Sequence, residues 1–175
     1  MRSPRGEARA VLEGDMSFAE LIQDAALCGD ATRLDVAAAT RLGRAFGTTL
    51  RRRSGGGAQT VVLSRVGQGR ELVLRDGLVR GLVLAGHHVR DLGLADDALL
   101  GFAVPELGAA GAVLASDQDG ALCLRFWLGQ RALSREALAE LAVLADGEDF
   151  AAGEGSLSLV DLRGAFRAHG RGDGA

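Results

Sequence analysis

Short apolar runs alternate with longer stretches of helical periodicity along the chain. Four runs have the length and the turn-forming borders of buried strands. They cover residues 60–64, 89–92, 112–115 and 122–128. Four longer stretches carry apolar residues at helical spacing, and they cover residues 32–53, 70–86, 96–108 and 134–145. Strands that alternate with helices predict βαβ units with right-handed crossovers and a mainly parallel sheet.

The last two apolar runs are separated by a polar segment, residues 116–120 (SDQDG). Aspartate and glycine favour tight connections, so this segment is interpreted as a short exposed loop. A short loop also predicts that the strand after it returns antiparallel to the strand before it. Polar groups that a rigid sheet holds on a loop are common sites of binding and catalysis.

These elements predict an α/β fold, a three-layer α/β/α sandwich with a mixed, mainly parallel sheet of about four strands. One domain over residues 16–169 accounts for them, with disordered tails at 1–15 and 170–175. Met16 is an alternative start to Met1. Residues 17–22 fit either a strand or a helix, and residues 156–162 fit either an edge strand or a linker.

Composition narrows the class of protein. A formal net charge of −3 lacks the basic excess of a nucleic-acid binder. No apolar run is long enough to span a membrane, which favours a cytoplasmic domain. The two cysteines, Cys28 and Cys123, are far apart in sequence and form neither a disulfide framework nor a zinc pattern, which favours a reducing compartment.

Several short motifs occur in an order that resembles the first domain of the α-D-phosphohexomutases, the phosphoglucomutase/phosphomannomutase family. These motifs are residues 43–48 (GRAFGT), 61–65 (VVLSR), 81–86 (GLVLAG), 89–93 (VRDLG) and 149–156 (DFAAGEGS). The resemblance covers roughly residues 18–169. It implies the three-layer fold and, in an intact relative, interconversion of hexose 1-phosphates and 6-phosphates by an intramolecular phosphotransferase.

The resemblance also implies two site residues. The family serine of a T-A-S-H-N-P motif carries a phosphoryl group, and a small deletion aligns Ser116 with it as the catalytic residue. An alignment without a gap places Gln118 there instead. Arg65 aligns with the first arginine of a strand-end motif and is the candidate ligand for a substrate phosphate.

Other family positions differ in this chain. No His-Asn-Pro follows the serine, and Val66 and Gln68 replace an aspartate and a second arginine. The family's magnesium loop and C-terminal phosphate clamp belong to later domains. Phosphoryl transfer depends on such groups, because a lone serine has no base or metal to activate it.

The favoured hypothesis is therefore a pseudoenzyme that uses no cofactor. It would act as a binding, regulatory or assembly module, and its partner would be a phosphosugar or a protein. The alternative is a mutase fragment completed by domains on another chain, with Ser116 as phosphoryl carrier and magnesium in the assembled enzyme. A third reading is an unrelated α/β phosphate binder, which the glycines of residues 67–69 (GQG) suggest at a helix start.

The remaining polar candidates have simpler interpretations. Asp117 and Asp119 resemble the start of a calcium loop but lack its other ligands, so they are interpreted as a solvated turn. His87 and His88 have no nearby metal-binding pattern and are interpreted as surface residues. Trp127 is assigned to the core or to an interface.

Overall fold

The computed structural model describes residues 16–67 and 69–172, so the predicted tail 1–15 lies outside the described residues. Its central element is an eight-stranded sheet in the order β1-β2-β6-β5-β3-β4-β8, with β7 paired to β6. The strands are β1 (Ile22–Gln23), β2 (Ala26–Gly29), β3 (Thr60–Val66), β4 (His88–Leu94), β5 (Gly111–Gln118), β6 (Ala121–Leu128), β7 (Arg131–Ala132) and β8 (Ser156–Leu159).

The sheet is mixed, as predicted, with a parallel part and an antiparallel part. Strands β5, β3, β4 and β8 run parallel, whereas β6, β2 and β1 continue the sheet by antiparallel pairing. The sheet has more strands than the predicted four. The additional strands have two to four residues each, and β1 and β7 have only two.

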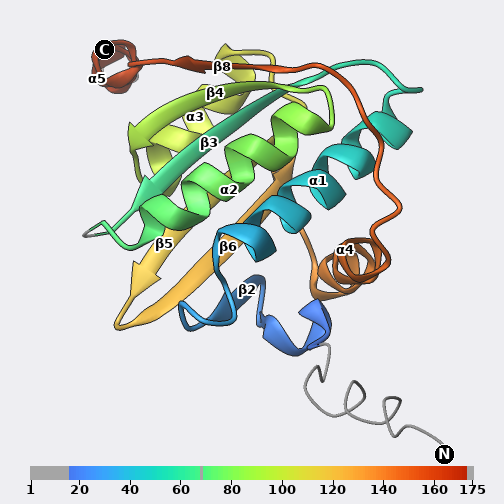
Figure 1. Ribbon diagram of the computed structural model, residues 1–175. Helices are drawn as coiled ribbons and strands as arrows, with labels where there is room; N and C mark the ends of the chain where they lie inside the picture. Colours follow the sequence, from blue (N-terminus) through green and yellow to red (C-terminus); the bar gives the residue numbers. More distant parts are fainter. Residues whose placement is uncertain (1–15, 68, 173–175) are drawn as a thin grey trace, which may run out of the picture.

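Helices cover both faces of the sheet, which confirms the three-layer architecture. Helices α1, α2 and α4 pack on one face, and α3 with α5 on the other (Figure 1). The helical elements are η1 (Phe18–Leu21), α1 (Val36–Arg53), α2 (Glu71–Leu84), α3 (Asp97–Glu106), α4 (Arg135–Gly147) and α5 (Arg163–Gly172). Residues 18–21, which the sequence left undecided, form the short 3₁₀ helix η1.

Buried side chains alternate between the two faces of the central strands. Leu63 and Val113 belong to the core beneath α1 and α2, whereas Val62 and Leu114 belong to the core beneath α3. All four are buried, as expected for strands covered on both sides.

The helix boundaries follow from capping residues. The Asp35 side chain accepts a hydrogen bond from the Ala38 N–H at 2.8 Å, so α1 begins at Val36 rather than at Thr32. Ser134 caps α4 in the same way, as predicted.

The C-terminal segment extends the domain beyond its predicted end. Strand β8 pairs with the edge of β4, and α5 continues through Gly172, where the sequence predicted a disordered tail from residue 170. The centres of the Phe166 and Phe102 rings lie 5.4 Å apart, and this contact holds α5 against α3. No helix within the described ranges is long and apolar enough to cross a membrane.

Helices α1 and α2 approach each other closely at three glycines. A Cβ atom at Gly43 would lie 2.8 Å from the Leu78 carbonyl oxygen, and one at Gly81 would overlap the Thr40 carbonyl oxygen. Gly77 likewise faces the backbone of α1. The absence of side chains here lets the two backbones make direct contact.

Gly81→Ala is expected to lower the free energy of unfolding by about 1–3 kcal/mol, because the added methyl group forces the two helices apart. Urea unfolding midpoints would measure this. The matched control is Gly101→Ala in α3, where an added Cβ meets nothing within 4 Å. That variant should be neutral or more stable, since alanine favours the helix. Equal losses in both variants would contradict the contact between the helices.

Candidate functional site

The carboxyl ends of β3 and β5 carry the two predicted site residues on neighbouring strands. In the parallel register Arg65 lies opposite Ala115, and Val66 lies opposite Ser116. Ala115 belongs to the core beneath α2, so Ser116, the next residue, points to the opposite face. Arg65 contacts a residue of α2 and therefore lies on the α2 side. The structure brings the two residues to one edge of the sheet but not to one face.

Ser116 lies within strand β5 and not on an exposed loop, so that part of the sequence prediction is wrong. Strand β5 continues through Gln118, which pairs with Ala121 of β6. The connection is reduced to Asp119 and Gly120, whose φ angles of 49° and 91° fit a two-residue hairpin turn. Ser116 is consequently only 2% exposed.

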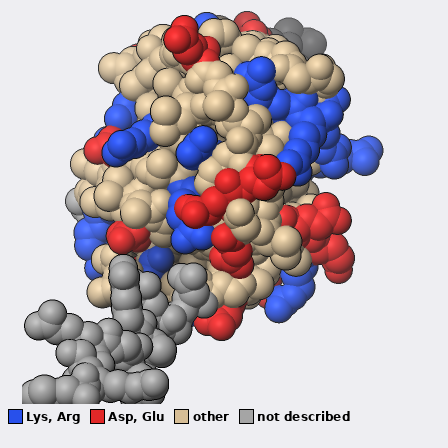
Figure 2. Space-filling view, turned by 45° about the vertical axis from the view of Figure 1, so that its right-hand side comes forward, with Lys and Arg blue, Asp and Glu red and all other residues tan. Residues whose placement is uncertain are grey.

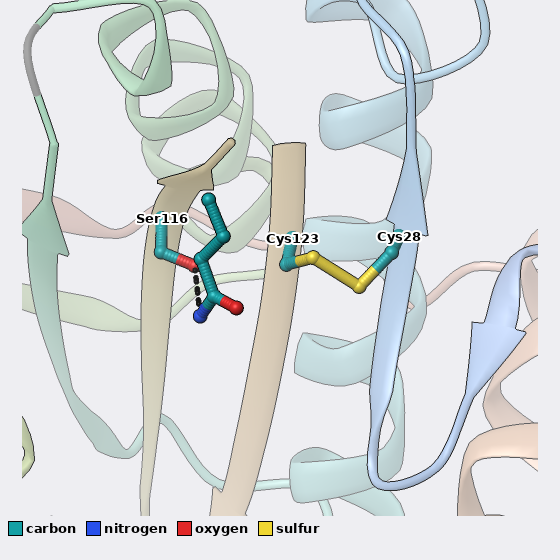
Figure 3. Close-up of a disulfide and its surroundings, with 4 residues drawn as sticks. Cys28, Ser116 and Cys123 are labelled. Atoms are coloured by element: carbon teal, nitrogen blue, oxygen red, sulfur yellow. Dashed lines mark hydrogen bonds between the residues drawn. A yellow bond between two sulfur atoms is a disulfide. The ribbon is translucent and has the colours of Figure 1, made fainter. Parts of the chain in front are cut away.

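The Ser116 hydroxyl has an amide neighbour and no base. Its oxygen accepts a long hydrogen bond from Gln118 Nε2 at 3.4 Å (Figure 3). Among the described residues, no other side-chain hydrogen bond to this hydroxyl is found. A serine becomes a nucleophile when an adjacent base or metal removes its proton, and an amide does neither.

Cys123 lies directly opposite Ser116 and forms a disulfide with Cys28 (Figure 3). The sequence prediction that these cysteines form no disulfide is therefore wrong. The two cysteines are 95 residues apart, but β2 and β6 are neighbours, and Cys28 and Cys123 face each other in the register. The disulfide could have been predicted from the sequence only by recognising the short strand β2 and its pairing with β6.

The start of α2 holds a buried carboxylate that sequence reasoning missed. Glu71 is fully buried; its Oε1 accepts from Arg65 Nη1 at 2.9 Å, and its Oε2 accepts from the Gly69 N–H at 2.9 Å. A helix start with free N–H groups favours an anion. The glycine-containing segment 67–69 thus leads into a helix start that favours an anion, and the anion there is the Glu71 carboxylate of the same chain.

Glu71 remains ionised in this setting. Burial raises the pKa of its carboxyl group, but the hydrogen bonds from the Gly69 N–H and from Arg65, together with the Arg65 charge, lower that pKa below its ordinary value. Arg65, the predicted phosphate ligand, is therefore paired with an ionised carboxylate of the same chain.

Two further arginines near this edge are paired with carboxylates. Arg70 Nε and Nη2 donate to the two oxygens of Asp117 at 2.7 and 2.8 Å, and the hydrogen bond from Arg70 lowers the pKa of Asp117. Arg125 pairs with Asp97 of α3. Asp117 is thus the ion-pair partner of Arg70. Among the described residues, no three His, Cys, Asp or Glu side chains lie close enough together to hold a metal ion.

Two of the three arginines in the last turn of α1 also have partners. Arg52 pairs with Asp149 at 3.0 Å, and Arg51 Nη1 donates to the Ala85 carbonyl oxygen at 3.2 Å. On the face shown in Figure 2, basic and acidic side chains lie next to one another, and neither charge covers the face. This arrangement is typical of a solvated helix end and not of a phosphate-binding patch.

His87 is buried, so its assignment to the surface is wrong. Its Nε2–H donates to the Gly47 carbonyl oxygen at 2.7 Å, and its Nδ1 accepts from the Gln59 N–H at 3.0 Å. This pair of bonds requires the neutral ring. Burial lowers the pKa of His87, and the charge of nearby Arg51 adds to the effect. His88 is half-buried, and its ring bonds to the Ser156 hydroxyl.

The free energy of unfolding should fall as the pH drops below about 6.5, the ordinary histidine pKa. In this range the unfolded chain takes up a proton at residue 87 and the folded chain does not, so acid favours unfolding. Urea midpoints between about pH 7 and pH 5 would measure the slope. His87→Gln should flatten it, and His169→Gln, on the exposed α5, should not. Parallel pH profiles for all three proteins would contradict the neutral buried ring.

Comparisons with known proteins support the fold. No protein-family model and no curated protein sequence matches the chain. A phosphoglucomutase/phosphomannomutase family protein from Burkholderia thailandensis matches 90% of this chain with a TM-score of 0.79 and 23% identity, over 36% of its own length. A protein from Thermus thermophilus, provisionally assigned as a phosphomannomutase, matches 88% of this chain with a TM-score of 0.67 and 27% identity, over 37% of its own length.

This chain spans little more than a third of the solved structures that it matches. The fold agrees with the resemblance that the order of sequence motifs indicates. The chain therefore has the fold of one part of a phosphoglucomutase/phosphomannomutase family protein.

Proposed function

We propose that the chain is a non-catalytic phosphohexomutase-like module that acts in binding, regulation or assembly. The observation that carries this proposal is the state of the candidate site. Its serine is buried, with no base bonded to it among the residues that the structure describes, and its arginine is bound to a carboxylate of the same chain. Its partner, by this proposal, is a phosphosugar or another protein.

The position of Ser116 disfavours phosphoryl transfer. A phosphoryl donor must reach the hydroxyl oxygen in line, whereas this hydroxyl is 2% exposed within a paired strand. Opening the β5–β6 hairpin to expose it would break the pairing beside a disulfide.

The charges around the site also disfavour phosphoryl transfer. A transferring phosphoryl group needs cationic groups that can stabilise its oxygens. Arg65 is bound to the buried Glu71, and Arg70 is bound through two bonds to Asp117. A phosphate would have to displace these carboxylates, and that of Glu71 is fully buried.

One observation favours a second candidate, a mutase fragment completed by domains on another chain, with Ser116 as phosphoryl carrier. The chain covers only 36% and 37% of the structures that it matches. In this second candidate the other chain supplies the magnesium site; the described residues contain no group of three metal-ligating side chains.

The two candidates differ in whether Ser116 takes up a phosphoryl group. The purified chain is incubated with glucose 1,6-bisphosphate and magnesium, and its intact mass is measured alongside Ser116→Ala. We expect no mass increase in either protein and no interconversion of glucose 1-phosphate and glucose 6-phosphate. A gain of one phosphoryl group that Ser116→Ala abolishes would contradict the proposal and favour the second candidate.

The cytoplasmic location predicted from the sequence stays a prediction. The Cys28–Cys123 disulfide favours an oxidising compartment instead, because glutathione and thioredoxin keep cytosolic thiols reduced. Alkylation of free thiols at the moment of cell lysis, followed by mass measurement, distinguishes the two. Alkylation of both cysteines would support the cytoplasm, and protection of both would contradict it.

A further inference from the structure

A hollow of about 240 Å³ lies between α3 and β6, on the face of the sheet opposite to Arg65. Its lining includes Trp127 and Arg125 of β6, Asp97 of α3, and Gln130 in the turn after β6. Ser116 is not among the lining residues. We call this hollow the Trp127 pocket.

The pocket exists because α3 covers only part of this face. The apolar side of α3, including Leu100 and Val104, packs on β3 and β5. The next strand, β6, presents Arg125 and Trp127 on the same face, and both remain half-buried. The floor of the pocket is therefore apolar and includes Ala112 of β5, whereas its rim carries three polar side chains.

The three rim side chains offer donors and acceptors but little net charge. The Arg125 guanidinium lies 4.8 Å from the centre of the Trp127 ring, and its Nη1 donates to Asp97 Oδ2. Asp97 therefore balances the charge of Arg125. Gln130 is exposed and has both a donor and an acceptor in one planar group.

We propose that the Trp127 pocket binds a single neutral pyranose sugar. A pyranose ring has an apolar face of C–H groups and a rim of hydroxyls, each of which both donates and accepts. The indole of Trp127 and the apolar floor suit the C–H face of the ring. The carboxylate of Asp97, the guanidinium of Arg125 and the amide of Gln130 suit its hydroxyls. The volume lies below that of sites for drug-sized ligands, which fits one ring rather than a chain of sugars.

The charge balance distinguishes this ligand from a free anion. Inorganic phosphate would meet the Asp97 carboxylate as well as the Arg125 guanidinium, so the pocket offers it no net attraction. The pocket does not depend on the proposed function, because no step of the argument uses Ser116. Sugar binding here is compatible with an inert or a phosphorylated serine.

Trp127 makes the pocket directly observable. It is the only tryptophan, and the chain has no tyrosine, so tryptophan emission comes from the pocket alone. D-glucose and D-mannose are titrated separately into the full chain, with inorganic phosphate and adenosine as comparison ligands. We expect a saturable change in emission with at least one of the sugars at millimolar concentrations, and none with phosphate or adenosine.

Variants test whether the rim makes the contacts. Gln130→Ala and Asp97→Ala should each weaken binding of the responding sugar by about tenfold, since each removes one set of hydrogen bonds to the ligand. Asp149→Ala is the control, because that carboxylate pairs with Arg52, a residue outside the pocket.

Three results would overturn the pyranose site. The first is no saturable emission change together with no saturation-transfer NMR signal on the ring protons of either sugar. The second is an equal affinity in the rim variants and the Asp149→Ala control, with all variants folded by circular dichroism. The third is saturable binding of phosphate or adenosine in place of both sugars.

Discussion

Reduction of the Cys28–Cys123 disulfide is expected to lower the free energy of unfolding by about 2–5 kcal/mol. The bond joins residues 95 positions apart, so its loss frees a long loop in the unfolded chain. In the folded chain it holds the short strand β2, which lies next to the edge strand β1, to β6. Urea midpoints with and without dithiothreitol would measure the effect.

The double variant Cys28→Ser, Cys123→Ser provides the control for reduction. It should unfold at the midpoint of the reduced protein and should not respond to dithiothreitol. If the oxidised protein, the reduced protein and the double variant share one midpoint, the disulfide contributes nothing to the stability of the domain, and the expectation is wrong.

Leu114→Ala is expected to cost about 2–5 kcal/mol of unfolding free energy, because it leaves a gap in a close-packed core. Leu114 is 3% exposed and belongs to the same core cluster as Val62 of β3 and Leu100 of α3. Asp119→Ala should cost at most about 1 kcal/mol, through the positive φ at that turn position. Denaturant midpoints of the two variants compare these values.

The comparison of Leu114→Ala with Asp119→Ala also tests the end of strand β5. Both residues belong to the β5–β6 hairpin, but only Leu114 faces a helix layer. An Asp119→Ala variant as damaging as Leu114→Ala would place the turn, rather than the core, at the centre of the stability of this hairpin.

The apolar runs predicted the long strands and the main helices well, because burial determines those elements. The end of β5 could not be predicted in this way. Residues 116–118 are polar, yet they continue the antiparallel ladder, whose hydrogen bonds need no apolar side chains. Ser116 therefore resembles a loop residue in the sequence and is a strand residue in the fold.

The candidate site was predictable only in part, because its geometry depends on register. The sequence places Arg65 at the end of one predicted strand and Ser116 on the loop after another, and it does not give the order of the strands in the sheet. In the structure these strands, β3 and β5, are neighbours, and Ser116 lies within β5. The sequence does not state that Arg65 pairs with Ala115, and this pairing directs the two side chains to opposite faces. Glu71 was missed because one acidic residue at a helix start is common, and its full burial arises only from the surrounding fold.

Glu71 gives a physical meaning to the loss of activity that we propose. The Gly69 N–H and the Arg65 guanidinium, two groups suited to an anion, are both present at this edge. The carboxylate of Glu71, part of the same chain, accepts a hydrogen bond from each of them. By this account phosphate is excluded because the place is occupied, and not because its donors have been lost.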